Sequence, residues 1–249
     1  MEDKIKKFAE FLKESEYVVF FGGAGVSTES NIPDFRSKDG LYNKRDVRFE
    51  NYEPEYLLSH SCLMNDTKVF FEFYRQKMDA RKALPNDAHK VLAKLEAAGK
   101  VKAVITQNID GLHQQAGSKN VYEIHGTTKR NYCERCLKNY PEDYIFDCKE
   151  EIPRCSCGGI VRPFVTLYEE QLPEDAVYGA IDAIKKADML IIGGTSLTVY
   201  PAAGYVRYFS GKHLVIINKD HIAYPLNSKT DLEINAPIGK VMREVIKLI

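Results

Sequence analysis

Apolar and polar residues along this chain follow two patterns, one typical of helices and one typical of buried strands. The first residues have helical spacing, with Ile5, Phe8, Ala9 and Leu12 recurring among charged side chains. Short runs rich in β-branched and aromatic residues are typical of buried parallel strands, and they occupy 17–21, 101–106, 121–124, 188–192 and 214–217. Helical patterns lie between or after them, at 87–98, 174–186, 201–209 and 238–248. Strands that alternate with helices predict an α/β fold, a parallel sheet with helices on both faces.

Two stretches interrupt this alternation. Residues 31–79 are irregular and then helical, and residues 127–163 contain most of the cysteines. Both look like insertions into the sheet domain. We therefore expect a large lobe of about 1–30, 80–126 and 164–249, and a small lobe of about 31–79 and 127–163.

The composition is that of a globular protein without an unusual charge. The 249 residues are 44% hydrophobic and 28% charged, and 35 Lys and Arg balance 35 Asp and Glu, so the net charge is zero. This balance argues against general nucleic-acid binding, which needs a surplus of basic residues. No stretch reaches the roughly 18 consecutive apolar residues of a membrane span. The N-terminus mixes charges and leads into no signal-like apolar segment, so we expect a cytoplasmic protein.

The cysteines predict a metal site. Five of the six lie within 25 residues, which favours metal binding over a disulfide scaffold. Cys133 and Cys136 form one close pair, and Cys155 and Cys157, followed by two glycines, form a second pair. Four thiolates complete a tetrahedral Zn²⁺ shell, and a shell without an open position is structural. Cys148 is then a spare thiol.

A glycine-rich turn follows the first strand, at residues 22–28. Such a turn can bring the backbone close to a pyrophosphate. The dinucleotide fingerprint is incomplete, because Thr28 stands at the third glycine position and the usual later acidic residue is missing. Tight packing without a ligand is the alternative. Just beyond, Asp34, Phe35 and Arg36 form either a flap over a nucleotide or an ordinary surface loop.

Polar residues follow three other strands. Gln107, Asn108 and Asp110 come directly after the strand at 101–106, and they suit sugar hydroxyls and a carboxamide. Asp110 alone could simply cap the next helix. Small and hydroxyl residues at 193–196, with Thr195 and Ser196, and Asn218 end two further strands. Because ligands of open α/β sheets bind at the carboxyl ends of strands, these turns predict one shared nucleotide crevice.

A histidine is the natural candidate for a general base near neutral pH. His125 precedes Gly126 at the end of a short strand, where such a base would be useful. His113 is its rival, and a purely structural role is the alternative for either residue.

Taken together, the motifs resemble those of the sirtuins, the NAD-dependent protein-lysine deacylases. The resemblance covers nearly the whole chain and looks like that of a compact bacterial member. Its motifs, in family order, are Gly23-Ala-Gly-Val-Ser, Ile32-Pro-Asp-Phe-Arg-Ser, Thr106-Gln-Asn-Ile-Asp, His125-Gly, the four cysteines, Gly194-Thr-Ser-Leu and Tyr200-Pro-Ala-Ala. It implies a Rossmann-type large lobe and a small lobe made of a helical insertion and a four-cysteine zinc ribbon.

The resemblance also implies a role for each matching residue. His125 would be the base and, with Asn108 and Asp110, the catalytic group. The NAD site would comprise Ala24, Thr28, Phe35, Arg36, Gln107, Asn108, Ile109, Asp110, His125, Thr195, Ser196, Asn218 and Ile238. Residues 164–169 would pair with the substrate peptide as an added strand.

The implied reaction removes acetyl groups from protein lysines. It would give nicotinamide, deacetylated lysine and O-acetyl-ADP-ribose, with nicotinamide also acting as an inhibitor. We expect a monomer that binds neither membranes nor nucleic acid. Mono-ADP-ribosyl transfer and a non-catalytic NAD-responsive module are the alternatives.

Three positions depart from the family pattern. Asn31 and Glu169 stand where glycine is usual, and the second cysteine pair is spaced Cys-x-Cys. We expect Asn31 to tolerate a positive φ and the backbone around Glu169 to differ slightly. A further difference concerns the acyl group. Sirtuins that prefer succinyl-lysine have Tyr-x-x-Arg where this chain has Tyr74 and Lys77, so a small neutral acyl group is expected.

Overall fold

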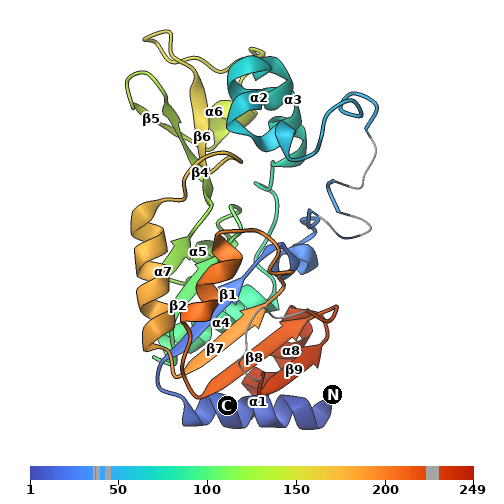
Figure 1. The fold of residues 1–249 in the computed structure, drawn as a ribbon, viewed down its shortest axis with the longest axis vertical. Coiled ribbons are helices and arrows are strands. Elements are labelled where there is room, and N and C mark those ends of the chain that lie inside the picture. The colour runs from blue at the N-terminus through green and yellow to red at the C-terminus, as the bar shows by residue number, and fades with distance from the viewer. Residues whose placement is uncertain (36, 38–39, 43–45, 223–229) are drawn as a thin grey trace.

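A six-stranded parallel sheet forms the lower half of the molecule in Figure 1. The computed structural model describes all of the 249 residues except 36, 38–39, 43–45 and 223–229. The strand order is β3-β2-β1-β7-β8-β9, the order of a Rossmann sheet. Its strands are β1 (Val18–Gly22), β2 (Val101–Thr106), β3 (Val121–Glu123), β7 (Met189–Gly193), β8 (His213–Asn218) and β9 (Leu232–Asn235). The predicted parallel sheet is confirmed, and β9 is an additional edge strand.

Helices cover both faces of this sheet, as predicted. Residues alternate between the faces along β1: Val18 and Phe20 join one apolar cluster, and Val19 and Phe21 join another. The first cluster includes residues of α1 (Glu2–Glu14), α4 (Asp87–Ala97) and α8 (Ile238–Val245). The second includes residues of α7 (Glu174–Lys186) and the 3₁₀ helix η4 (Ala202–Tyr208). The expected helix at 201–209 is therefore 3₁₀, and the last helix continues as the 3₁₀ turn η5 (Ile246–Leu248).

The upper half of Figure 1 contains the two inserted segments. A second, antiparallel sheet has the order β5-β4-β6, so β6 is an edge strand. Its strands are β4 (Gly126–Cys133), β5 (Asn139–Pro141) and β6 (Val161–Val165). Three helices and a 3₁₀ turn accompany it: α2 (His60–Asn65), α3 (Thr67–Lys77), α6 (Asp143–Phe146) and η3 (Tyr56–Leu58). One buried cluster joins Phe70 and Phe71 of α3 with Cys133 and Val161 of this sheet, so both inserted segments share a core.

Short helical turns lie between the two halves. They are the 3₁₀ turns η1 (Ala24–Val26) and η2 (Thr28–Ser30), and the helix α5 (Leu112–Ala116). Within the described ranges, no helix has the length and apolar character needed to cross a membrane.

Candidate functional site

The carboxyl ends of three neighbouring strands lie level with one another. Gly22 at the end of β1 pairs with Thr106 of β2 on one side and with Gly193 of β7 on the other. The strand order reverses between β1 and β7, which is the switch point where open α/β sheets bind their ligands. The turns after these strands therefore border the expected crevice.

Two glycine-rich turns pack backbone to backbone at this switch point. The Gly25 N–H donates to the Gly194 carbonyl at 2.8 Å. A Cβ atom at Gly25 would lie 2.8 Å from the Gly194 Cα, and one at Gly23 would lie 2.8 Å from the Thr195 Cβ. The glycines are thus needed for packing between the turns. This packing also places Thr195 beside Gln107, whose Nε2 donates to the Thr195 hydroxyl at 3.0 Å.

A buried serine links the two polar residues that follow β2. The Ser27 hydroxyl donates to Asp110 Oδ2 at 2.7 Å and accepts from Asn108 Nδ2 at 3.0 Å. The other Asp110 oxygen accepts the N–H of Leu112, the first residue of α5, at 2.9 Å, although Gly111 is the N-cap residue of this helix. Asp110 thus supports the start of the helix and also belongs to the polar cluster. Ser27 was not among the predicted site residues, and its place directly after the glycine turn was the available signal.

His125 is oriented by a backbone carbonyl. Its Nδ1 lies 3.0 Å from the Gln107 oxygen. A carbonyl only accepts, so Nδ1 carries the proton and Nε2 keeps a free lone pair. Burial lowers the pKa of His125 below its ordinary value, although the bond to Gln107 acts in the opposite direction. The imidazole is therefore neutral at neutral pH, as a general base must be.

Gly126 makes this position of His125 possible. Its φ is 75°, and a Cβ atom there would lie 2.2 Å from the Phe164 oxygen. Only glycine fits. The His125 carbonyl in turn accepts the Thr166 N–H at 2.9 Å, which connects the candidate base to the segment after β6.

The rival histidine lies in the core. His113 is 1% exposed, and its ring is 4.7 Å from that of His89. Neither of its ring nitrogens has a hydrogen-bond partner among the residues that the structure describes, and burial holds its pKa well below the ordinary value. A group that takes a proton from a bound ligand has to be reachable. His125 meets this requirement better than His113.

The remaining predicted NAD contacts near the first glycine-rich turn lie in different elements. Ala24 lies in η1, and the exposed Thr28 begins η2 with its hydroxyl donating to the Gly25 carbonyl at 3.0 Å. The Phe35 ring lies 5.3 Å from the Tyr42 ring. Arg36 lies outside the described residues.

The predicted NAD contacts that follow β7 and β8, together with Ile238, divide into exposed and buried residues. The Ser196 hydroxyl is exposed and lies 2.8 Å from that of Thr198. Asn218 at the end of β8 is half-buried and donates to the Asp220 carbonyl. Ile238 is 3% exposed, and its side chain packs against Gly193, so only its backbone could meet a ligand. The Ile109 carbonyl is already bonded to Thr128.

The four predicted cysteine ligands come together. Their Sγ atoms all lie within 4.8 Å of one another, with Cys133 and Cys157 3.5 Å apart and Cys136 and Cys155 3.6 Å apart. A tetrahedron with Zn–S bonds of about 2.3 Å has sulfur atoms about 3.8 Å apart, so this set fits Zn²⁺. The Cys-x-Cys spacing does not prevent this closure.

Gly159 and Cys148 both fit a zinc site made of the four clustered cysteines. A Cβ atom at Gly159 would lie 2.6 Å from the Cys133 Sγ, so the turn after the second cysteine pair needs glycine here. Cys148 is outside the cluster, and its thiol lies 3.8 Å from the Glu150 carbonyl.

Two carboxylates anchor the segment that follows β6. Glu169 has a φ of 76°, and its side chain accepts the N–H and the hydroxyl of Ser61 at 2.9 and 2.7 Å. Glu170 forms two bonds with the buried Arg162 at 2.5 and 2.8 Å, and its carboxylate also meets His60 at 3.0 Å. This segment therefore has a fixed backbone where it continues β6, the edge strand of the small sheet.

The residues at the Tyr-x-x-Arg position differ in their contacts. Tyr74 is fully buried, with its ring stacked between Phe70 and Phe146, and its hydroxyl has no hydrogen-bond partner among the described residues. Lys77 pairs with Asp46 at 3.2 Å. A negatively charged acyl group would have to compete with Asp46 for this ammonium.

Comparison with known proteins identifies close relatives. The sequence model of the Sir2 family matches residues 23–201. An NAD-dependent protein deacetylase of Clostridium perfringens is 56% identical over 99% of this chain and 100% of its own length. One of Clostridium acetobutylicum is 55% identical over 98% of both chains. A solved Sir2 structure with deacetylated p53 peptide and 3'-O-acetyl-ADP-ribose is 37% identical, covers 98% of both chains and has a TM-score of 0.87. A Sir2 structure with p53 peptide and NAD+ is 38% identical over 98% of both chains, with a TM-score of 0.83.

Proposed function

The chain belongs to the Sir2 family, and from this premise we propose that it is an NAD-dependent protein-lysine deacetylase. It transfers the acetyl group of a protein lysine to ADP-ribose, giving nicotinamide, deacetylated lysine and O-acetyl-ADP-ribose. The observation that carries this proposal is the His125 side chain, neutral and with Nε2 free, which is held by the carbonyl of Gln107, the residue that precedes the Ser27-linked Asn108.

The roles that we propose for the site residues are those of the family, and the hydrogen bonds around His125 and Ser27 support them. The acetyl oxygen displaces nicotinamide from the ribose carbon, and binding both substrates in one crevice supplies the proximity that this weak nucleophile needs. His125 Nε2 then accepts a proton from a ribose hydroxyl, whose oxygen attacks the imidate carbon formed in the first step, and the Gln107 carbonyl stabilises the imidazolium that results. Water then adds to the same carbon and releases the lysine amine, which leaves the acetyl group on the ribose. Asn108 and Asp110, held by Ser27, shape the pocket for the nicotinamide carboxamide.

NAD occupies the turns at the switch point of the sheet. Gln107 meets the ribose of the nicotinamide half, and Thr195, whose hydroxyl accepts a hydrogen bond from Gln107, belongs to the contacts at the adenosine end. The other contacts that we propose are Ala24, Thr28, Phe35, Arg36, Ile109, Ser196, Asn218 and the backbone of Ile238.

The acetylated peptide binds along residues 164–169. The edge position of β6 supports this proposal, because an edge strand offers backbone groups to a further strand. The bond between Thr166 and His125 places this segment next to the base.

Cys133, Cys136, Cys155 and Cys157 hold one structural zinc ion. When bound, zinc cross-links the two ends of the ribbon and leaves no open position for chemistry.

We further propose that the chain divides into a large lobe of about 1–30, 80–126 and 164–249 and a small lobe of about 31–79 and 127–163. The protein is a cytoplasmic monomer, is inhibited by nicotinamide and does not bind nucleic acid.

One incubation tests the function. The protein is mixed with NAD and an acetyl-lysine peptide, and the products are followed by mass spectrometry. We expect a peptide lighter by one acetyl group together with acetyl-ADP-ribose, both dependent on NAD. ADP-ribosylated protein without loss of acetyl would instead favour mono-ADP-ribosyl transfer. An unchanged peptide together with unmodified protein would contradict both.

A further inference from the structure

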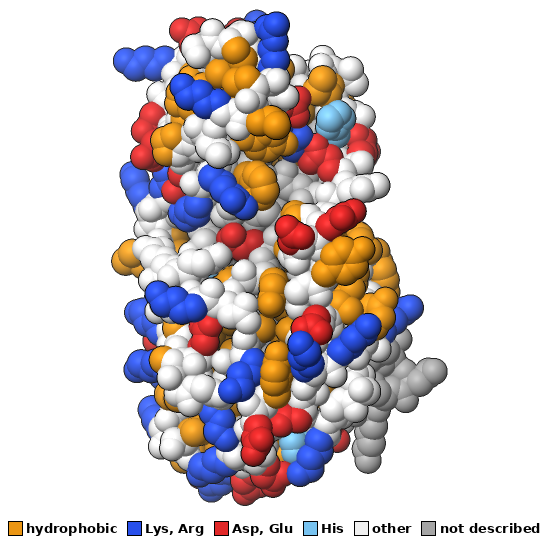
Figure 2. Space-filling view, turned by 90° about the vertical axis from the view of Figure 1, so that its left-hand side faces the viewer, with side chains coloured by type: hydrophobic (Ala, Val, Ile, Leu, Met, Phe, Trp, Pro, Cys, Tyr) orange, Lys and Arg blue, Asp and Glu red, His pale blue; other side chains and the backbone are white. Residues whose placement is uncertain are grey.

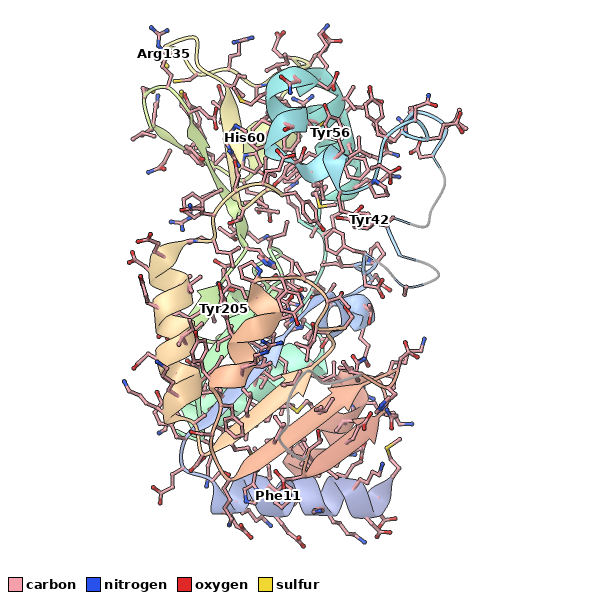
Figure 3. All side chains as sticks on the ribbon, in the orientation of Figure 1. Phe11, Tyr42, Tyr56, His60, Arg135 and Tyr205 are labelled. Atoms are coloured by element: carbon pink, nitrogen blue, oxygen red, sulfur yellow. The ribbon has the colours of Figure 1, made fainter. Side chains whose placement is uncertain are left out.

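A groove of about 380 Å³ lies next to the proposed peptide segment. It is bordered by the residues that follow β6, by the first turns of α7 and by the start of η4. Leu172, Val177 and Pro201 supply apolar surface, and Tyr178 and Tyr205 supply aromatic rings. Tyr205 lies between η4 and α7 in Figure 3. Figure 2 shows this side of the molecule, where acidic and hydrophobic side chains lie together at mid-height.

One face of α7 supplies both an aromatic ring and a carboxylate. Glu174, Val177 and Tyr178 are spaced three and four residues apart, so their side chains are neighbours on the helix surface. Tyr178 is 69% exposed, so its ring is accessible from the groove. A ring face beside a carboxylate is favourable for a cation.

The charge of the groove is negative and only partly balanced. No lysine, arginine or histidine lines it within the described part of the chain. Glu170 is neutralised by its paired bonds with Arg162. Glu174 forms no ion pair with any described residue. One carboxylate at the rim therefore lacks a counter-charge.

We propose that this groove binds a lysine or arginine side chain of the substrate that lies near the acetyl-lysine in sequence. The proposal rests on the proposed function and adds a charge preference to it. The aliphatic part of such a side chain would cover Leu172 and Val177, and its cation would lie between the Glu174 carboxylate and the Tyr178 ring. The groove begins at Glu170, directly after the segment that we assign to the peptide, so a flanking side chain can reach it.

A simpler explanation of Glu174 has to be separated from this one. Acidic residues are common in the first turn of a helix because they complement its dipole. Asp175 is in the same turn of α7 and is equally exposed, but it does not line the groove. Asp175→Asn is therefore a matched control for Glu174→Gln, since each variant removes one charge from the same turn.

The test uses one acetyl-lysine peptide in which each of the three residues on either side is replaced in turn by Arg, Ala or Glu. We expect Arg to raise kcat/KM over Ala by about fivefold at one or two positions, mainly through KM, and Glu to lower it. Glu174→Gln and Tyr178→Ala should each reduce this preference, and Asp175→Asn should keep it. Raising the salt concentration should weaken the preference in the wild-type protein.

Several results would overturn the proposal. Equal kcat/KM for all peptides would do so while leaving the deacetylase function intact. An equal loss of preference in Asp175→Asn and Glu174→Gln would show that the effect is one of overall charge. Fluorescence anisotropy of the labelled Arg and Glu peptides without NAD provides a second readout. If no acetyl group is removed at all, the binding measurement still tests the groove. Equal binding of the two peptides would refute the proposal, and tighter binding of the Arg peptide that Glu174→Gln abolishes would support it.

Discussion

Replacing Ser27 by alanine should damage both stability and activity, because one hydroxyl holds two site residues. Ser27 is 1% exposed and Asp110 is 6% exposed, so water cannot replace the lost bonds fully. The bond to the Asp110 carboxylate is charge-assisted and contributes about 1.5–3 kcal/mol, and the bond from Asn108 contributes about 0.5–1.5 kcal/mol. We therefore expect the free energy of unfolding to fall by about 2–4 kcal/mol.

The kinetic effect should accompany this loss. Without the Ser27 hydroxyl, the Asn108 amide and the Asp110 carboxylate are no longer joined, and the nicotinamide pocket loses its fixed shape. A cost of about 1.4 kcal/mol in the transition state corresponds to about a tenfold loss of kcat/KM. Urea unfolding of the zinc-loaded protein and initial rates on an acetylated peptide measure the two effects.

Ser118→Ala is the matched control. Ser118 is 3% exposed, and its hydroxyl has no hydrogen-bond partner within the described ranges. The same atom is removed at the same depth, but no bond is lost, so stability should change by less than about 1 kcal/mol in either direction. Equal stabilities and equal rates for Ser27→Ala and Ser118→Ala would refute the reasoning.

Five further predictions concern other parts of the protein. Removing any one of the four clustered cysteines, for example by Cys157→Ala, should lose zinc and lower the melting temperature, and Cys148→Ala should keep both; metal analysis showing the reverse would change the ligand set. His125→Ala should abolish deacetylation and leave NAD affinity largely unchanged in calorimetry. Because burial lowers the pKa of His125 below 6.5, kcat/KM should fall only as pH drops through that lower pKa; a midpoint above 6.5 would contradict a buried neutral base. Deacetylation should be faster than desuccinylation of the same peptide, and Lys77→Arg should raise the latter if this position faces the acyl channel. Glu169→Ala should be less stable than Glu169→Gly by about 1–2 kcal/mol, since both lose the bonds to Ser61 but only alanine keeps a Cβ at positive φ; equal stabilities would exclude a left-handed backbone there.

The elements that the sequence predicted well depend on local patterns. Buried parallel strands are continuous apolar runs, and their abrupt ends at glycine and polar residues marked the crevice. The four cysteines were identifiable because their spacing alone limits what they can bind. Strand β9 has only four residues and no such run, so its pairing with β8 depends on tertiary contacts that the sequence does not show.

The choice between the two histidines illustrates a different limit. Both follow or end a predicted strand, and both have the same intrinsic pKa. Their environments differ because α5 turns His113 inward against His89, whereas Gly126 lets the chain fold back and leaves His125 at the strand ends. The Ser27 bonds to Asn108 and Asp110 likewise join residues more than eighty positions apart. Such contacts become visible only when the sheet brings its strand ends together.

The two departures from glycine show how side chains can preserve a backbone conformation. Asn31 has a φ of 63° at the end of η2, the region that asparagine tolerates better than most residues, as predicted. Glutamate has no such tolerance, yet Glu169 has a φ of 76° and therefore adopts a backbone that glycine would accept without strain. Its two bonds to Ser61 offset a cost of about 1–2 kcal/mol. The same bonds add a side-chain contact with α2 to the backbone hydrogen bonds that already join Tyr168 to Leu58 and His60. The substitution thus exchanges an unstrained turn for a strained one that has more contacts beside the proposed peptide strand.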